Sequence, residues 1–172
     1  MKKLIIPALL AFLVAGCSST PDSGDGAPVV NRDGSGVATV NAGGVYAGKL
    51  PPELTDPKNI LSKRSVYFDY DSFEVKPEYK DLVTAHAKFL AGRSQFKILI
   101  QGNTDDRGSR EYNLALGQKR ADAIKKMLTL LGAREEQVES VSLGEEKPKN
   151  EGQNETAWAE NRRGDMLYNG EF

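Results

Sequence analysis

Apolar and polar residues divide the chain into three parts with different patterns. Leu4 to Ala15 is an almost wholly apolar run, whereas residues 18–62 are polar, with scattered hydrophobic residues that follow no period. From Lys63 onward, apolar residues recur with the periods of strands and helices. We therefore expect a short apolar leader over residues 1–16, a flexible segment over 17–62 and one folded domain over 63–172.

Within the periodic part, strand-like and helix-like patterns alternate. Gly132 is placed to end the longest helix. Strands that alternate with helices are typical of an α/β fold, so we expect a two-layer sandwich. The pattern predicts strands at 65–68, 96–101, 138–143 and 162–168, and helices from Pro77 to Gly92, over 110–131 and over 156–161. The expected apolar face of the longest helix consists of Leu114, Ala121, Ile124, Leu128 and Leu131.

The apolar leader indicates export from the cytoplasm. It follows Met1-Lys2-Lys3 and is shorter than the roughly 20 residues that a membrane-spanning helix needs, as in a secretory signal. Val14-Ala15-Gly16-Cys17 resembles a bacterial lipobox, which implies cleavage before Cys17 and acylation of that residue, palmitate included. Cys17 is the only cysteine, so it has no disulfide partner within the chain. Ser18, and not aspartate, follows it, which by resemblance to lipoprotein sorting favours the outer membrane.

Residues 17–62 are predicted to be a tether, because they contain too little apolar surface to offset the entropy of ordering. About 45 flexible residues have an r.m.s. span of roughly 35–40 Å, and their extended reach is about 150 Å. The stretch around Pro51-Pro52-Glu53-Leu54 is the part that can pack on the domain. An acylated end and a globular domain in the periplasm can therefore occupy different layers of the cell envelope.

Composition and motifs argue against several classes of function. The 23 basic and 24 acidic side chains nearly cancel, which disfavours a nucleic-acid partner. His86 is the only histidine and lies in a predicted helix, where a packed histidine is the simpler interpretation. The chain has no Gly-x-Ser-x-Gly elbow, no phosphate loop and no metal-binding histidine pair. We therefore expect no enzymatic activity, no cofactor and no metal.

One loop and the helix after it combine groups suited to binding. Asp105 lies in the polar loop 102–108, and Arg120 lies on the long helix. A carboxylate that receives an ammonium group and a guanidinium that grips a carboxylate would together fit a zwitterion. Gly117 lies inside the same helix, where glycine is less stable than alanine. Close approach of a ligand or of a neighbouring backbone would explain a glycine at this position. The spacing alone leaves open whether Asp105 and Arg120 hold a ligand or pair with each other and cap the helix.

Several motifs resemble the OmpA-like peptidoglycan-binding domain. They are Val-Tyr-Phe-Asp-Tyr-Asp at 66–71, Gly-Asn-Thr-Asp-Asp-Arg-Gly at 102–108, Glu-Tyr-Asn-Leu-Ala-Leu-Gly-Gln-Lys-Arg-Ala at 111–121, Ser-Leu-Gly-Glu-Glu-Lys-Pro at 142–148 and Asn-Arg-Arg at 161–163. The resemblance implies binding of the peptidoglycan stem peptide at its meso-diaminopimelate residue. It places the key aspartate and arginine at Asp105 and Arg120, with further contacts from Tyr70, Asp71, Thr104, Asn113 and Leu116.

The leader and tether extend the resemblance to lipoprotein members of this family. It implies a non-catalytic protein that tethers the outer membrane to the wall as part of the Tol-Pal system. This role supports envelope integrity and outer-membrane constriction at cell division. It also implies binding to the periplasmic protein TolB, and a protein such as TolB as the main ligand is the alternative function.

The sequence departs from the family pattern at two places. Asn103 stands where many members have histidine, although its amide can still form hydrogen bonds. Gly164-Asp165 interrupts the apolar strand expected after Arg162 and Arg163. Those two arginines are equally suited to bracing the fold through ion pairs and to contacting a ligand.

Overall fold

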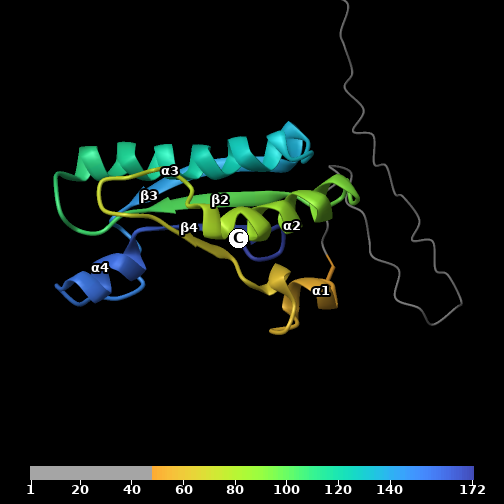
Figure 1. The fold of residues 1–172 in the computed structure, drawn as a ribbon, viewed down its shortest axis with the longest axis horizontal. Coiled ribbons are helices and arrows are strands. Elements are labelled where there is room, and N and C mark those ends of the chain that lie inside the picture. Colours follow the sequence, from red (N-terminus) through yellow and green to blue (C-terminus); the bar gives the residue numbers. More distant parts are fainter. Residues whose placement is uncertain (1–47) are drawn as a thin grey trace, which may run out of the picture. The chain divides into compact units, whose positions relative to one another are not determined.

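The structure, a computed structural model, describes residues 48–172 (Figure 1). The predicted leader, Cys17 and most of the predicted tether lie outside the described residues. Four strands form one sheet in the order β1-β4-β2-β3. The strands are β1 (Ser65–Tyr67), β2 (Ile98–Asn103), β3 (Val138–Gly144) and β4 (Arg163–Tyr168).

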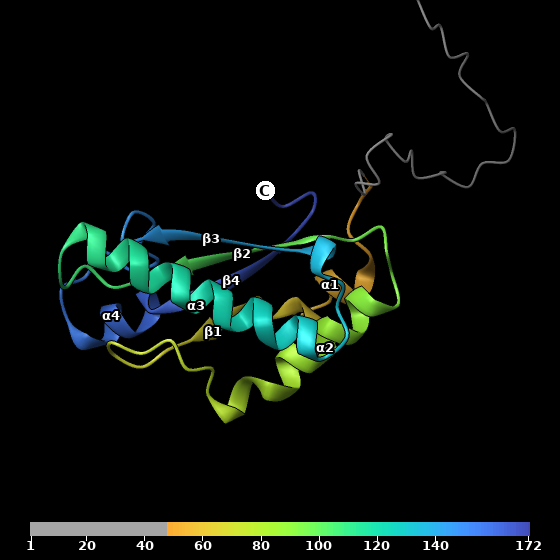
Figure 2. The ribbon, with the colours of Figure 1, turned by 90° about the horizontal axis from the view of Figure 1, so that it is seen from above.

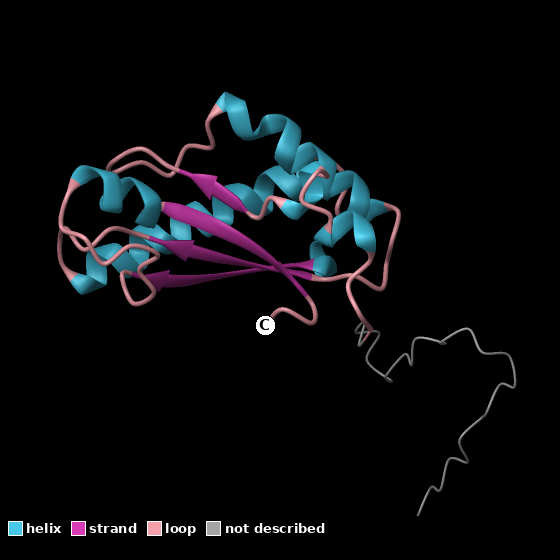
Figure 3. Ribbon diagram, turned by 90° about the horizontal axis from the view of Figure 1, so that it is seen from below, coloured by secondary structure: helices cyan, strands magenta, loops and turns pink. Residues whose placement is uncertain are grey.

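Two long helices cover one face of this sheet. They are α2 (Lys80–Ala91) and α3 (Arg110–Leu130), and α3 runs along the strands (Figure 2). Seen from below, the strands lie in front of α3 (Figure 3). Residues that point to the helices, such as Ile100 and Met166, are buried, whereas alternate residues such as Gln101 and Leu167 are partly exposed. The two-layer α/β sandwich expected from the sequence is confirmed.

Short elements complete the domain at both ends. Three are 3₁₀ turns, which are η1 (Ile60–Ser62), η2 (Pro77–Tyr79) and η3 (Glu135–Gln137), and two are short helices, α1 (Pro52–Thr55) and α4 (Glu155–Asn161). Residues 48–62 fall within the predicted tether, yet α1 and η1 form there and Leu54 belongs to the hydrophobic core. A guanidinium anchors this segment, because Arg64 Nη2 donates to the Leu54 carbonyl over 2.9 Å.

The interruption at Gly164-Asp165 does not weaken the last strand, which lies inside the sheet. β4 is antiparallel to both β1 and β2, with Gly164 opposite Val66 and Gly102. A Cβ at Gly164 would come within 2.4 Å of Ile124 Cδ1, so glycine lets α3 pack closely. Asp165 accepts from Ser65 Oγ over 2.6 Å. Gly164 and Asp165 interrupt the hydrophobic pattern of the sequence, but both fit the structure of strand β4.

The apolar face predicted for α3 was wrong at Leu114, which is 52% exposed. The buried stripe near the start of the helix contains polar Asn113 and Arg120 instead. Gly117 lies in this stripe, and a Cβ there would be 2.3 Å from Ser142 Oγ and 2.8 Å from the Gly102 carbonyl oxygen. A neighbouring backbone, and not a ligand, accounts for this glycine.

His86 is a fully buried histidine that fastens the start of β1 to the core. Its Nε2 donates to the Lys63 carbonyl over 3.0 Å, which leaves Nδ1 to accept from the Tyr168 hydroxyl over 2.8 Å. Burial lowers the pKa of His86 to about 4. The prediction of a packed histidine is confirmed.

We expect this histidine to make the domain sensitive to acid. Below pH ~6.5 the unfolded chain takes up a proton at His86 that the folded chain refuses until about pH 4. The free energy of unfolding should therefore fall by about 3 kcal/mol across this window. Urea unfolding of wild type and His86→Gln at several pH values measures it. Parallel pH profiles for the two proteins would contradict the assignment.

Candidate functional site

A small cavity lies where the loops after β1 and β2 meet the start of α3. Its volume is about 140 Å³. All seven residues that the sequence marked for ligand binding line it, although three separate segments contribute them. The lining consists of Tyr70, Asp71, Thr104, Asp105, Arg107, Gly108, Tyr112, Asn113, Leu116 and Arg120.

Asp105 is a buried carboxylate held by two arginines. Its Oδ2 accepts from Arg107 Nη2 over 2.7 Å and from Arg162 Nη1 over 3.2 Å, and its Oδ1 accepts from the Arg107 backbone N–H over 3.2 Å. Burial raises the pKa of Asp105, but the hydrogen bonds from these arginines outweigh it and leave the pKa below its ordinary value. Asp105 is therefore a fixed negative charge at one side of the cavity.

Arg120 is the corresponding positive charge, and its side chain is completely buried. It donates to three backbone carbonyls, namely those of Ser72 at 2.8 Å, Asn103 at 2.9 Å and Asp69 at 3.1 Å. Burial lowers the pKa of Arg120 to about 10, while nearby Asp105 opposes this effect. The guanidinium thus remains charged at neutral pH, and within residues 48–172 no carboxylate forms a salt bridge with it.

This geometry argues against one of the two interpretations that the spacing left open, namely that Asp105 and Arg120 pair with each other; ligand binding by them stays a prediction. The two side chains do not cap the helix as a pair, because each has its own separate partners. Ser109 caps α3 instead, its hydroxyl accepting from the Tyr112 N–H over 3.2 Å. A negative and a positive group therefore line the same cavity without forming a salt bridge with each other.

The remaining lining residues come from both loops and from α3. Asp71 has a left-handed backbone with φ of 54°, which is rare for a residue other than glycine, and it accepts from the Tyr112 hydroxyl. Asn113 donates to Glu145, the residue that follows β3. The Thr104 hydroxyl is buried and has no hydrogen-bond partner among the described residues.

Sequence reasoning missed three lining residues and left two neighbours undecided. Arg107, Gly108 and Tyr112 line the cavity, and the only signal was that they lie inside the motifs that carry Asp105 and Asn113. Arg162 and Arg163 brace the fold, the first through Asp105 and Glu155 and the second through Asp165. Asn103 does not line the cavity; it is buried, and its carbonyl accepts a hydrogen bond from Arg120.

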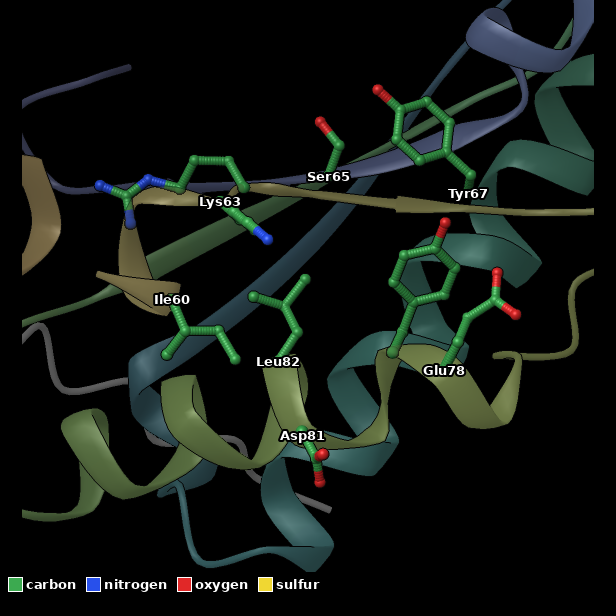
Figure 4. Close-up of a pocket in the computed structure, with 9 residues that line it drawn as sticks. Ile60, Lys63, Ser65, Tyr67, Glu78, Asp81 and Leu82 are labelled. Atoms are coloured by element: carbon green, nitrogen blue, oxygen red, sulfur yellow. The ribbon is translucent and has the colours of Figure 1, made fainter. Parts of the chain in front are cut away.

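A second, larger groove of about 560 Å³ lies between β1 and the start of α2 (Figure 4). Ile60, Leu82 and Tyr67 line it, and Lys63 reaches toward the space between them. None of the predicted site residues belongs to it. Of its charged residues, Lys63, Glu78 and Asp81 are exposed, and the partly buried Arg64 already pairs with Glu171 at 3.4 Å. None of them is a buried charge without a counter-ion.

Two further features of residues 48–172 bear on function. No helix in this part of the chain is long and apolar enough to cross a membrane. Nor does this part bring three or more histidine, cysteine, aspartate or glutamate side chains into an arrangement that would hold a metal ion.

Known proteins resemble the chain over most of its length. The sequence model of the OmpA family matches residues 67–162. The peptidoglycan-associated lipoprotein of Pasteurella multocida is 41% identical over 168 residues, which are 98% of this chain and 100% of the relative. The protein of the same name from Pseudomonas aeruginosa is 40% identical over 159 residues, covering 91% of this chain and 90% of the relative.

Solved structures agree with these sequence matches. The crystal structure of the peptidoglycan-associated lipoprotein from Burkholderia pseudomallei has a TM-score of 0.67 and 55% identity, and the match covers 67% of this chain and 98% of that one. The C-terminal domain of Helicobacter pylori MotB shares the fold at 19% identity, with a TM-score of 0.57 over 62% of this chain and 84% of that one.

The fold and the relatives together define the class. The chain belongs to the OmpA family and, within it, to the peptidoglycan-associated lipoproteins. Membership places it among non-catalytic proteins of the cell envelope, which agrees with the expectation that it is not an enzyme.

Proposed function

We propose that the chain binds peptidoglycan through the cavity between Asp105 and Arg120. The observation that carries this proposal is the state of Arg120, a buried cation whose hydrogen-bond acceptors within residues 48–172 are three backbone carbonyls. A guanidinium has five N–H groups, so two of them remain for a ligand. Because a buried charge without a counter-ion is costly, the site favours an anionic group such as a carboxylate.

The rest of the cavity extends this preference to a zwitterion. Asp105 offers the negative charge that an ammonium group needs, and the Thr104 hydroxyl is a hydrogen-bonding group without a partner among residues 48–172. Leu116 adds an apolar contact. The free end of meso-diaminopimelate carries an ammonium and a carboxylate on one carbon. The stem peptide of peptidoglycan is therefore the ligand that we infer, in agreement with the name of the relatives.

We further infer that the chain connects two layers of the envelope. The lipobox at Cys17 implies a lipid anchor in the outer membrane, and two or more acyl chains anchor a protein stably. The domain would then hold the wall, support outer-membrane constriction at division and act with the Tol-Pal proteins, TolB included. Metabolic labelling with palmitate tests the anchor, since Cys17→Ser should abolish the label; persistent label in that variant would refute it.

An alternative is that a periplasmic protein is the main ligand of the same face. Exposed aromatic side chains around the cavity favour it, because Tyr70 is 61% exposed and Tyr112 49% exposed. Aromatic residues are enriched where proteins bind one another.

Co-sedimentation with purified sacculi, repeated with excess free diaminopimelate peptide, distinguishes the two functions. We expect the full chain to sediment with the wall and to be released by the peptide. Failure to sediment, or sedimentation that the peptide leaves unchanged, would favour the protein-partner alternative.

A further inference from the structure

Several contacts join the loop that carries Asp105 to helix α4. The proposed binding of a ligand by Asp105 and Arg120 does not explain these contacts. Trp158 Nε1 donates to Asp106 over 2.7 Å. The guanidinium of Arg107 lies 4.2 Å from the Tyr70 ring centroid and 4.2 Å from the Trp158 ring centroid, so two aromatic rings enclose it. Its Nη1 also approaches Glu155 Oε2 at 3.7 Å.

Arg107 contacts the Asp105 carboxylate at both oxygens. The backbone N–H of Arg107 binds Oδ1, and its Nη2 binds Oδ2 at 2.7 Å, the shortest bond that Asp105 accepts. These bonds and the one from Arg162 occupy three of the roughly four lone-pair positions of a carboxylate. One lone-pair position of the Asp105 carboxylate therefore remains free, and Asp105 lines the cavity.

We propose that Arg107 is a positioning residue, which fixes the Asp105 carboxylate so that its free lone pair faces a ligand ammonium group. This inference rests on the proposed function. The enclosing rings hold Arg107 itself: a guanidinium over an aromatic face gains about 0.5–1 kcal/mol at exposed sites and more when desolvated. Tyr70 comes from the loop after β1 and Trp158 from α4, so the Arg107 contact joins three segments around Asp105.

The arrangement has an electrostatic consequence. Three arginines lie near the Asp105 carboxylate: Arg107 in the same loop, Arg162 just before β4, and Arg120 on α3. Asp71 and Tyr112 also line the cavity. Burial raises the pKa of Asp105, and hydrogen bonds from Arg107 are the first of the effects that lower it. Removal of Arg107 should therefore raise this pKa, so binding should fail at a higher pH.

The test is calorimetric titration of the full chain with the soluble tripeptide L-Ala-γ-D-Glu-meso-diaminopimelate, between about pH 3 and 8. We expect Arg107→Ala to weaken binding at neutral pH by about tenfold or more, comparable with the loss of orienting partners at metal sites. The acid limit of binding should also move to higher pH. Arg107→Lys, which keeps the charge without the planar fork, should lie between.

Arg110→Ala is the matched control. Arg110 lies three residues away with an exposed side chain that pairs with Glu146 at 2.7 Å, and it does not line the cavity. We expect this variant to bind as wild type does. Trp158 is the only tryptophan in the chain, so its fluorescence shows whether the stack with Arg107 is intact in each variant.

The possible results separate the inference from the function on which it rests. No binding by wild type would overturn the proposed function and the inference with it. If wild type binds and Arg107→Ala binds equally tightly, only the inference is overturned, because Arg107 then plays no part in binding. Tighter binding by the variant also overturns only the inference, because Arg107 then competes with the ligand. A uniform loss of affinity with an unchanged acid limit would also overturn it, since a purely structural brace would give that result.

Discussion

Asp105→Asn should reduce binding to purified sacculi by at least about thirtyfold. The variant keeps the size of the side chain but removes the charge that an ammonium group requires. Loss of one partner from a buried charge-assisted contact costs about 2–5 kcal/mol, and each 1.4 kcal/mol is about a factor of ten. Co-sedimentation over a range of wall concentrations measures the change.

Asp106→Asn is the matched control for this prediction. Asp106 is exposed, and the hydrogen bond that it accepts from Trp158, the one it accepts within the described part of the chain, can also be accepted by an amide oxygen. Binding should therefore change little. Urea unfolding of both variants is needed as well, because Asp105 also neutralises buried Arg162. An essential Asp106 with a dispensable Asp105 would show that the loop presents the other carboxylate.

Arg120→Ala would not test ligand binding alone. The side chain supports the backbone of both loops through the carbonyls of Asp69, Ser72 and Asn103, so its removal should lower stability together with affinity. A buried acceptor left without a donor costs about 1–3 kcal/mol. Arg120→Lys retains the charge and is the better comparison at this position.

Among glycine-to-alanine substitutions in residues 48–172, Gly102→Ala should be the most destabilising. A Cβ at Gly102 would lie 1.8 Å from the Gly117 carbonyl oxygen and 2.7 Å from its carbon, both of them backbone atoms that cannot rotate away. Helix α3 would have to separate from β2 at the point where the binding loop begins. Because overpacking typically costs about 1–3 kcal/mol, we expect a loss of about 3 kcal/mol or more, measured by urea unfolding.

Gly92→Ala provides the control for this prediction. The nearest atom to a Cβ there is the Lys88 carbonyl oxygen at 3.6 Å, an ordinary contact, and the residue ends a helix with a negative φ. The two substitutions add the same group at places with different space. Similar unfolding midpoints for the two variants would contradict the close approach of α3 and β2.

The sequence predicted the sheet, its helices and the residues that meet at the cavity, because these depend on local periodicity and on contiguous motifs. It failed at the N-terminal half of α3, where hydrophobicity suggested Leu114 as a core residue. There the buried stripe contains Asn113 and Arg120, whose burial depends on partners from other segments. A hydrophobic pattern cannot reveal a polar side chain that distant carbonyls satisfy.

The same limit explains what was missed around Asp105. Its partner Arg162 lies 57 positions away, and the rings that enclose Arg107 belong to the loop after β1 and to α4. Gly117 shows the opposite case. The sequence shows that a glycine at this position destabilises the helix. Only the structure shows that the Gly102 backbone and Ser142 leave no room for a larger residue there.

The central claim is recognition of a zwitterion, and calorimetric titration of the full chain with three stem peptides tests it most directly. The peptides carry meso-diaminopimelate, its amidated form, or lysine at the third position, and each is measured at two salt concentrations. The last two lack the carboxylate that Arg120 would bind, so affinity should fall at least about tenfold, or about 1.4 kcal/mol. Salt should matter less, because buried charges are weakly screened. Equal affinities for the three peptides together with strong salt dependence would contradict the roles of Asp105 and Arg120.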